Sequence, residues 1–148
     1  MKVSKVLLKD HLEDIKRVLP THHEEVENSG WVINPDWLKY QELEDSGSLL
    51  VHVVYDGLDL VGYSVDVISD SLHYKGKRVS VNDGLYINPA YRGLGLNRIM
   101  MDAVLAYLRS EGIDSYTQHR KTDHPGTITM KKSGFEQVEV VWHKILET

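Results

Sequence analysis

The sequence predicts a mixed α/β fold, and three features of the chain predict it. Two strand-like runs, Ser48–Tyr55 and Leu58–Ile68, flank Asp56-Gly57, which is a strong signal for a hairpin turn. A later strand leads through a glycine-containing loop into an amphipathic helix within Asp83–Leu108. The strand after this helix, Asp114–His119, is expected to run parallel to its predecessor because the helix forms a crossover. The chain therefore combines an antiparallel meander with one parallel crossover.

The N-terminal end is expected to form a strand and then a helix. Val3–Leu8 is short and partly β-branched, as many strands are. Asp10 is placed to cap a helix that runs from about His11 to Leu19, and Pro20 marks the end of that helix. Residues 21–34 carry no clear pattern.

A second helix and a further strand precede the glycine loop. Asn34-Pro35-Asp36 starts the helix, and Ser46-Gly47 stops it. After the hairpin, Tyr74–Lys77 forms a turn into a strand over Arg78–Ile87. Three antiparallel strands are therefore expected to lead into the glycine loop.

The C-terminal part is expected to close the sheet. Pro125 fits the first turn of a short helix that reaches Lys132. Phe135–Leu146 is expected to supply the closing strand or strands, with Trp142 in the core. The predicted order of elements is β-α-α-β-β-β-α-β-α-β, and no composition shift marks a domain boundary within residues 1–148.

The stretch Asp83–Leu108 also carries a chemical signal. Its strand ends at Ile87, because Asn88-Pro89 stops a sheet ladder, and the loop over residues 91–95 opens directly into the helix. Backbone N–H groups at a helix N-terminus have no partner within the helix, and the helix dipole favours negative charge there. Glycine lets the backbone approach a ligand, and Arg92 adds a forked cation that suits phosphate. The stretch predicts a phosphate-bearing ligand held by the main chain.

These residues resemble a known family. Arg92-Gly93-Leu94-Gly95-Leu96-Asn97 is similar to the R-x-x-G-x-G/A signature of the GNAT acyltransferases, which cradles the pyrophosphate of acetyl-coenzyme A. Gly134-Phe135 near the C-terminus fits the same family. The resemblance implies one GNAT-like domain, with a mixed, mostly antiparallel sheet that is splayed at the cofactor strand and flanked by about four helices. It also implies acetyl-coenzyme A as co-substrate, bound by Leu85, Tyr86, Ile87, Arg92, Gly93, Leu94, Gly95, Leu96 and Asn97.

Two other nucleotide-binding motifs fail on spacing. A Walker loop needs Lys-Ser/Thr after its last glycine, where this chain has Leu96-Asn97. A Rossmann fingerprint needs a third glycine and an early βαβ unit, and this chain has neither. Asn97 departs from the GNAT signature as well, because it stands where a glycine or alanine usually lies. Its side chain is expected near the cofactor phosphates, while the main-chain donors remain.

The resemblance implies acetyl transfer by direct attack of an amine on the thioester. Leu85, Tyr86 and Ile87 would pair through their main chain with the pantetheine arm, and one N–H there would polarise the thioester oxygen. The amine must lose a proton, either to a carboxylate or through ordered water. Asp83 is the candidate base, at a position where several relatives carry a carboxylate. A capping or salt-bridged strand residue is the alternative interpretation of Asp83.

The residue expected to protonate the leaving thiolate differs from the family pattern. The usual tyrosine of a Tyr-x-x-x-Gly-Phe pattern corresponds to Met130 here, and methionine cannot donate a proton. Tyr116, Tyr86, His119 or water would substitute by position. This departure keeps a second class of function open, namely a catalytically weak acyl-coenzyme A sensor or an interaction protein on a GNAT scaffold.

Composition excludes several other classes. A hydrophobic content of 41% and a charged content of 26% are ordinary for a soluble globular protein. The net charge of -5 argues against nucleic-acid binding, and the lack of cysteine excludes thiolate chemistry. No apolar run approaches a membrane span and no secretory signal is visible, so a cytoplasmic protein is expected. The histidines show no metal-ligand spacing, so no metal site is expected.

Charge patterning bears on the partner. Residues 21–45 hold seven carboxylates against Lys39, and residues 115–134 hold four basic side chains against Asp123. Two solvated helix faces explain this asymmetry, but it would also suit a cationic acceptor opposite an anionic cofactor. Only 14 residues follow Gly134, so the usual loop over the acceptor groove is expected to be truncated. With this loop truncated, the groove would be more open and would admit a protein lysine or N-terminus. Alternatively, a second subunit in a homodimer would complete the groove.

The sequence therefore predicts a small GNAT-like N-acetyltransferase. It would move an acetyl group from acetyl-coenzyme A to a primary amine, either a small cationic amine or a protein lysine or N-terminus. Asp83, Tyr86 and Tyr116 are its catalytic candidates.

Overall fold

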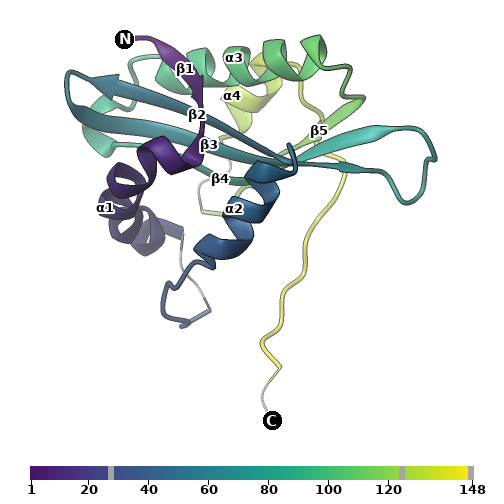
Figure 1. The fold of residues 1–148 in the computed structure, drawn as a ribbon, viewed down its shortest axis with the longest axis horizontal. Helices are drawn as coiled ribbons and strands as arrows, with labels where there is room; N and C mark the ends of the chain where they lie inside the picture. Colours follow the sequence, from purple (N-terminus) through teal and green to yellow (C-terminus); the bar gives the residue numbers. More distant parts are fainter. Residues whose placement is uncertain (27–28, 124–125, 147–148) are drawn as a thin grey trace.

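The computed structural model describes residues 1–26, 29–123 and 126–146, and its centre is a sheet of five strands (Figure 1). The strands lie in chain order; the first four are antiparallel to their neighbours, and the fifth is parallel to the fourth. They are β1 (Val3–Val6), β2 (Leu49–Asp56), β3 (Asp59–Asp70), β4 (Arg78–Ile87) and β5 (Ser115–Thr117). The expected mixed, mostly antiparallel sheet is confirmed.

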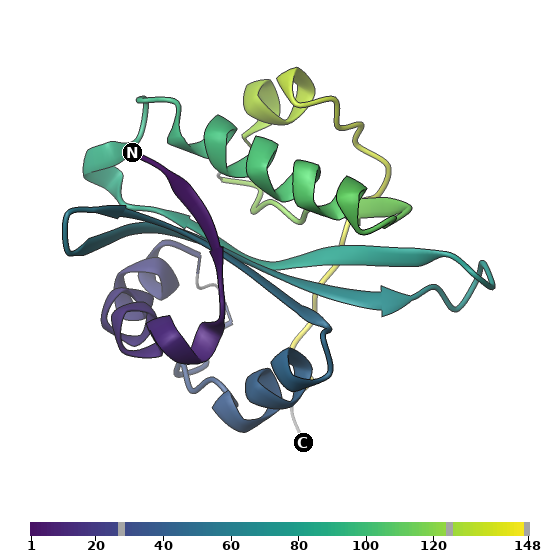
Figure 2. The same cartoon turned by 45° about the horizontal axis from the view of Figure 1, so that its top comes forward.

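Helices cover both faces of this sheet, as Figure 2 shows. One face carries α1 (Leu8–Val26) and α2 (Trp37–Asp45), and the other carries α3 (Leu96–Ser110) and α4 (Thr127–Lys132). On the first face, Ile15 packs with Val51 and Tyr63 in one buried cluster. On the second face, Met100 packs with Val61 in another. The sheet therefore separates the apolar core under α1 and α2 from the apolar clusters under α3.

The predicted turns between the antiparallel strands are present, and so is the predicted end of the helix after the glycine loop. Gly57 joins β2 to β3 with a φ of 60°, and Gly76 precedes β4 with a φ of 86°. The helix α3 follows the glycine loop directly, as predicted. Gly112 ends it in the left-handed conformation, and the N–H of Ile113 donates back to the carbonyl of Leu108 at 3.0 Å.

The predicted start of the first helix is wrong. The helix begins at Leu8 and not at His11, and Asp10 lies inside it. The N–H groups of Leu8 and Lys9 donate to the carboxylate of Glu44 on α2. This cap comes from a residue 36 positions away, so no local pattern announces it.

The predicted end of this helix is wrong as well. Instead of stopping at Pro20, α1 continues to Val26. Proline removes one helical hydrogen bond, but Leu19, His22 and Val26 lie on the same side of the helix and line a pocket against the sheet. These contacts favour a continued helix, and tertiary packing overrides the local preference.

The C-terminal prediction is also wrong within the described residues. Phe135–Leu146 forms no strand, and the chain leaves α4 as an extended segment that reaches away from the sheet (Figure 1). Trp142 is 91% exposed and lies outside the core. A strand needs a neighbouring strand for its backbone hydrogen bonds, and this segment has none. The position predicted for Pro125 lies outside the described residues. None of the helices in the described part of the chain has the length and apolar content needed to cross a membrane.

A buried histidine makes the stability of this fold depend on pH. His52 of β2 is 3% exposed and lies edge-on to Tyr107 of α3, with ring centroids 6.3 Å apart. Burial, with a smaller contribution from the positive charge of Lys5, lowers the pKa of His52 from 6.5 to about 4. The unfolded chain therefore binds a proton at a higher pH than the folded chain does.

We expect the free energy of unfolding to fall as the pH drops from about 6.5 to about 4, because protonation favours the unfolded chain in that range. The His52 contribution to this loss is on the order of 2 kcal/mol by about pH 5. Urea unfolding at about pH 7.5 and at about pH 5 measures it. The variant His52→Gln should lose less stability than the wild-type protein between these two conditions. Equal losses would show that His52 is not the group responsible.

Candidate functional site

The loop between β4 and α3 is anchored at both ends. Asn88 accepts a hydrogen bond from the N–H of Ala90 at 2.9 Å and so caps the short 3-10 helix η1 (Pro89–Tyr91). The hydroxyl of Tyr91 donates to Asp56 at the end of β2, at 2.5 Å. The loop is therefore tied to the β2–β3 turn before it reaches its glycines.

Two glycines shape the loop into an open cradle. Gly93 and Gly95 have φ values of 78° and 82°, a conformation that costs an L side chain about 1–2 kcal/mol. A Cβ at either position would meet nothing within 4 Å, so the space beside the backbone is open. Gly95 is the N-cap of α3, and no side chain caps that helix. Its first-turn N–H groups, from Leu96 to Arg98, are therefore available to an anion.

Asn97 lies in this first turn, and its side-chain oxygen is buried. Among the described residues, this oxygen has no hydrogen-bond partner. A buried acceptor without a partner is costly unless a bound donor or water satisfies it. The open space beside the glycines and the uncapped helix start fit an anionic ligand, whereas this buried oxygen would need a donor such as a water molecule.

Arg92, next to the cradle, is bonded to two protein groups. Its Nε donates to the carbonyl of Ile87 at 2.9 Å, and its terminal nitrogen pairs with Glu25 of α1 at 2.5 Å. The guanidinium of Arg92, predicted to bind phosphate, is therefore paired with the carboxylate of Glu25 in this structure. The cradle depends on main-chain donors, and Arg92 ties the end of β4 to the end of α1.

The strand before the loop has an open edge. β5 pairs with β4 only where Val79–Val81 faces Ser115–Thr117. Beyond this point no strand lies beside Leu85–Ile87 on the β5 side within the described residues, although their other edge pairs with β3. This is the splay that the sequence predicted at the cofactor strand. It leaves backbone groups for an extended ligand next to the cradle.

A β-bulge places Asp83. Opposite β3, Asn82 pairs with Asp66 and Gly84 pairs with Val65, so Asp83 is an extra residue without a cross-strand partner. Bulges re-aim side chains, and this one directs Asp83 toward α2, where the hydroxyl of Tyr40 donates to its carboxylate. Burial and this hydrogen bond raise the pKa of Tyr40 well above its usual value, so its hydroxyl keeps its proton.

Asp83 lines a pocket of about 460 Å³ on the α1 and α2 side of the sheet. At its floor, His22 of α1 hydrogen-bonds the hydroxyl of Tyr63 at 2.5 Å, and its ring lies 5.3 Å from that of Tyr86. Burial is the main cause that lowers the pKa of His22, so its imidazole is neutral near pH 7. A carboxylate and a neutral imidazole in one pocket are both able to accept a proton.

The three predicted catalytic side chains do not come together. Tyr86 is 3% exposed and shares the α1 face with Asp83. Tyr116 lies on the α3 face, where its hydroxyl donates to the buried Asp66 at 2.5 Å. Burial raises the pKa of both groups in that pair, which holds the tyrosine protonated. The sheet therefore separates Tyr116 from Asp83.

Sequence reasoning missed Tyr40, His22 and Tyr63. Tyr40 lies on the helix that the sequence did predict, but its contact with Asp83 joins residues 43 positions apart. For His22 a signal existed: Ile15, Leu19, His22 and Val26 repeat at helical spacing across Pro20. That spacing indicated a helix where proline had been expected to stop it.

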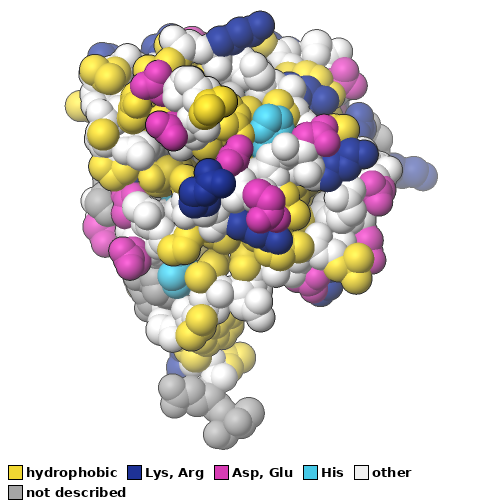
Figure 3. Space-filling view, turned by 60° about the vertical axis from the view of Figure 1, so that its left-hand side comes forward, with side chains coloured by type: hydrophobic (Ala, Val, Ile, Leu, Met, Phe, Trp, Pro, Cys, Tyr) yellow, Lys and Arg dark blue, Asp and Glu magenta, His cyan; other side chains and the backbone are white. Residues whose placement is uncertain are grey.

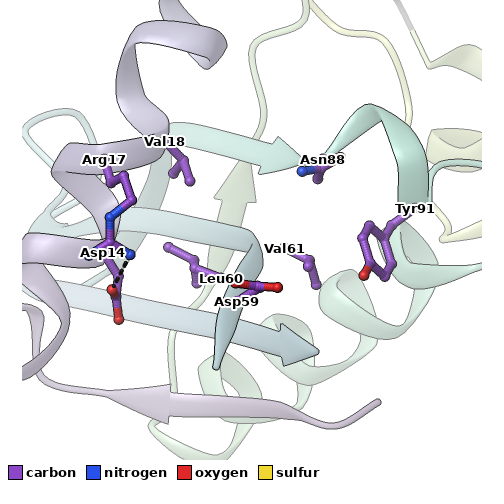
Figure 4. Close-up of a pocket in the computed structure, with 8 residues that line it drawn as sticks. All are labelled: Asp14, Arg17, Val18, Asp59, Leu60, Val61, Asn88 and Tyr91. Carbon is purple, nitrogen blue, oxygen red and sulfur yellow. Dashed lines mark hydrogen bonds and ion pairs between the residues drawn. The ribbon is translucent and has the colours of Figure 1, made fainter. Parts of the chain in front are cut away.

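A second, smaller pocket of about 240 Å³ lies between α1, the β2–β3 turn and η1 (Figure 4). Asp14 and Arg17 extend from α1 on one side, and Asn88 and Tyr91 face them from the other. Asp14 pairs with Arg17 at 3.0 Å, so these charges already satisfy each other. The pocket that contains Asp83 is therefore the candidate for chemistry. Among the described residues, no group of His, Asp and Glu side chains suits a metal ion.

Charge on the surface is mixed. On the face shown in Figure 3, Lys and Arg side chains lie beside Asp and Glu side chains with apolar side chains around them, and no continuous acidic surface appears. Several acidic residues of the segment 21–45 have structural partners instead. Glu25 holds Arg92, Asp36 caps α2 through the N–H of Lys39, and Glu44 caps α1.

The described chain thus combines a sheet splayed beside a glycine cradle with a pocket on the same strand, an arrangement that suits a phosphate-bearing ligand next to a second ligand. The family model of the acetyltransferase (GNAT) family matches residues 12–135, and the chain belongs to this family. Members of the family use acetyl-coenzyme A, and the cradle and the open β4 edge fit that donor.

Solved structures of other members share the fold. An aminoglycoside N-acetyltransferase AAC(6')-Iy in complex with coenzyme A is 14% identical, with a TM-score of 0.73 over 99% of this chain and 100% of that one. The ribosomal-protein-alanine N-acetyltransferase of Brucella melitensis biovar Abortus 2308 is 12% identical, with a TM-score of 0.72 over the same shares. The glucosamine-6-phosphate N-acetyltransferase of Arabidopsis thaliana is 10% identical, with a TM-score of 0.74, again over 99% and 100%. A comparison with curated proteins found no match.

The cradle allows a matched test of its glycines. We expect Gly95→Ala to weaken acetyl-coenzyme A binding at least about tenfold, because the left-handed backbone at the helix start would be strained and the N–H groups would shift. Gly112→Ala is the control, since Gly112 ends the same helix with a φ of 70° and equally open surroundings. Isothermal titration calorimetry measures both. Equal affinities for the two variants would contradict the cradle.

Proposed function

We propose that this protein is an N-acetyltransferase that transfers the acetyl group of acetyl-coenzyme A to a primary amine. The observation that carries the proposal is the meeting of two features on β4. The open edge at Leu85–Ile87 leads into the glycine cradle, and the bulge at Asp83 opens into the pocket. Donor and acceptor would therefore approach the same strand from opposite sides.

The reaction balances without a covalent enzyme intermediate. Acetyl-coenzyme A supplies the acetyl group; the amine nitrogen forms a bond to the carbonyl carbon, and the bond from that carbon to sulfur breaks. A cationic acceptor first gives one proton to Asp83, which frees the lone pair of its nitrogen for attack. The nitrogen loses a second proton as the amide forms, and coenzyme A leaves as a thiol after it gains one. Tyr40 fixes the carboxylate of Asp83 through its hydrogen bond. A main-chain N–H within Leu85–Ile87 would stabilise negative charge on the thioester oxygen.

Two tyrosines are candidates for the proton donor, since Met130 cannot act. Tyr86 shares the face of Asp83, and burial is the main cause that raises its pKa, which keeps its hydroxyl protonated. Tyr116 donates its hydroxyl hydrogen to Asp66, so it would first have to break that bond. These contacts favour Tyr86 over Tyr116 in this role.

We expect Asp83→Asn to lower kcat by about 10²- to 10⁴-fold, because an amide cannot accept the proton of the amine. The affinity for acetyl-coenzyme A should stay unchanged, since the cradle lies beyond the bulge. Asp70→Asn at the exposed end of β3 serves as the control and should keep full activity. A steady-state assay of free thiol release measures all three proteins. Full activity in Asp83→Asn would rule out this carboxylate as the base.

A sensor of acyl-coenzyme A is the second candidate function, and specific observations favour it. Methionine occupies the usual position of the proton donor, and Arg92 is already paired with Glu25. A sensor would bind acetyl-coenzyme A in calorimetry and acetylate no amine. An enzyme would bind it and release coenzyme A when an amine is added.

We also propose that a second copy of this chain covers the C-terminal segment. Four apolar side chains of this segment are exposed: Val138 at 77%, Val140 at 69%, Val141 at 68% and Trp142 at 91%. Such a run is unfavourable in water unless something covers it. β5 is a short edge strand with open backbone groups, and such an edge accepts another strand. A twofold dimer would pair each tail with the sheet edge of the other copy and would help to close the acceptor side.

We expect Trp142→Asp to shift the protein from dimer to monomer, because a carboxylate would be buried in the dimer without a partner. Light scattering after size exclusion measures the mass at several concentrations. Leu72→Asp is the matched control, since Leu72 is 99% exposed in the β3–β4 turn and lies away from the tail. A monomeric wild-type protein at every concentration would refute the dimer and leave the enzymatic proposal intact.

A further inference from the structure

The mouth of the larger pocket is an exposed apolar run. Trp31, Val32 and Ile33 follow one another in the chain, line this pocket and are 67%, 89% and 40% exposed. Three consecutive exposed apolar side chains are unfavourable unless something covers them. They stand at the entrance of a cavity, so a ligand that enters the cavity is placed to cover them.

The interior continues this apolar surface. Trp37 and Tyr40 of α2 lie with their ring centroids 5.6 Å apart, and Leu19 and Val26 of α1 face the same cavity. Among the described residues that line the pocket, Asp83 is the one carboxylate. A largely apolar pocket with few polar groups binds a ligand that is itself mostly apolar.

The acidic segment does not make this pocket a polycation site. Glu25 and Glu44, two of its carboxylates, hold Arg92 and the start of α1, and neither lines the pocket. Asp45 accepts a hydrogen bond from Gln41 at 2.8 Å on α2. For the hypothesis of a cationic acceptor, the described lining therefore offers a single carboxylate, Asp83.

We infer that the acceptor is a small primary amine with one positive charge and an apolar, preferably aromatic, body. This inference rests on the proposed acetyl transfer and names its substrate class. The amine lies at Asp83, beside the open edge of β4, and the body lies along Trp37 toward the mouth. Trp31 is the specificity-determining residue that covers the outer part of the body.

The test compares amines that share a reacting group and differ in body. The probes are 2-phenylethylamine, ethanolamine and the polyamine spermidine, each with saturating acetyl-coenzyme A. We expect kcat/KM for 2-phenylethylamine to exceed that for ethanolamine by about 10- to 100-fold, because a phenyl group leaves water for the pocket. Spermidine should fall near ethanolamine, because one carboxylate cannot satisfy several charges.

Two variants at exposed apolar side chains locate the effect. Trp31→Ala should lower kcat/KM for 2-phenylethylamine by about tenfold and leave that for ethanolamine unchanged. Leu72→Ala removes an exposed apolar side chain from the β3–β4 turn, outside the pocket lining, and should change neither value. Because Trp31 is mostly exposed, its replacement is not expected to unfold the protein.

The outcomes separate this inference from the proposed function. Preference for spermidine, equal use of 2-phenylethylamine and ethanolamine, or no effect of Trp31→Ala would overturn the apolar acceptor while acetyl transfer stands. More efficient acetylation of a peptide N-terminus than of any small amine would also overturn it. If no amine is acetylated, calorimetric titration of 2-phenylethylamine with coenzyme A present decides the ligand class. Binding that Trp31→Ala weakens would support the apolar pocket and reject the enzyme, and no binding would reject both.

Discussion

The β-bulge at Asp83 is the constraint on which both parts of the site depend. Side chains alternate along a strand, so one extra residue moves every later side chain to the opposite face. Asn82 and Leu85 consequently both face the α3 side, although three positions separate them. Asp83 and Tyr86 both face the α1 side. A strand without the bulge could not direct Asp83 into the pocket and Leu85 toward α3 at once.

The second constraint is the backbone conformation of the glycine loop. Gly93 and Gly95 hold left-handed conformations that keep the start of α3 uncapped and open. Arg92 ties the start of this loop to the end of β4 and to α1, since it donates to the carbonyl of Ile87 and to the carboxylate of Glu25. The donors that this loop leaves open are therefore main-chain N–H groups, while the nearby cation joins the strand to α1.

The acidic segment shows how charge in a sequence differs from charge at a site. Carboxylates accept hydrogen bonds strongly, and a helix start offers unpaired donors, so Asp36 and Glu44 act as caps. What remains in the pocket is Asp83 among aromatic and aliphatic side chains. The lining of this pocket is therefore largely apolar although the chain as a whole has a net charge of -5.

The sequence by itself determined the features that local chemistry controls. Asp56-Gly57 predicted the hairpin, the apolar period after Gly95 predicted α3, and the loop over 92–97 predicted the family and its donor. These signals are local because turn conformation and helix amphipathicity depend on neighbouring residues.

Only the tertiary structure decided the rest. Whether α1 passes Pro20, which side chain caps it, and whether residues 135–146 find a strand partner all depend on groups distant in sequence. The same holds for the site, because a bulge is a register between two strands and the partners of Asp83 come from α2. Sequence patterns report what a residue prefers near its neighbours, and long-range packing selects among those preferences.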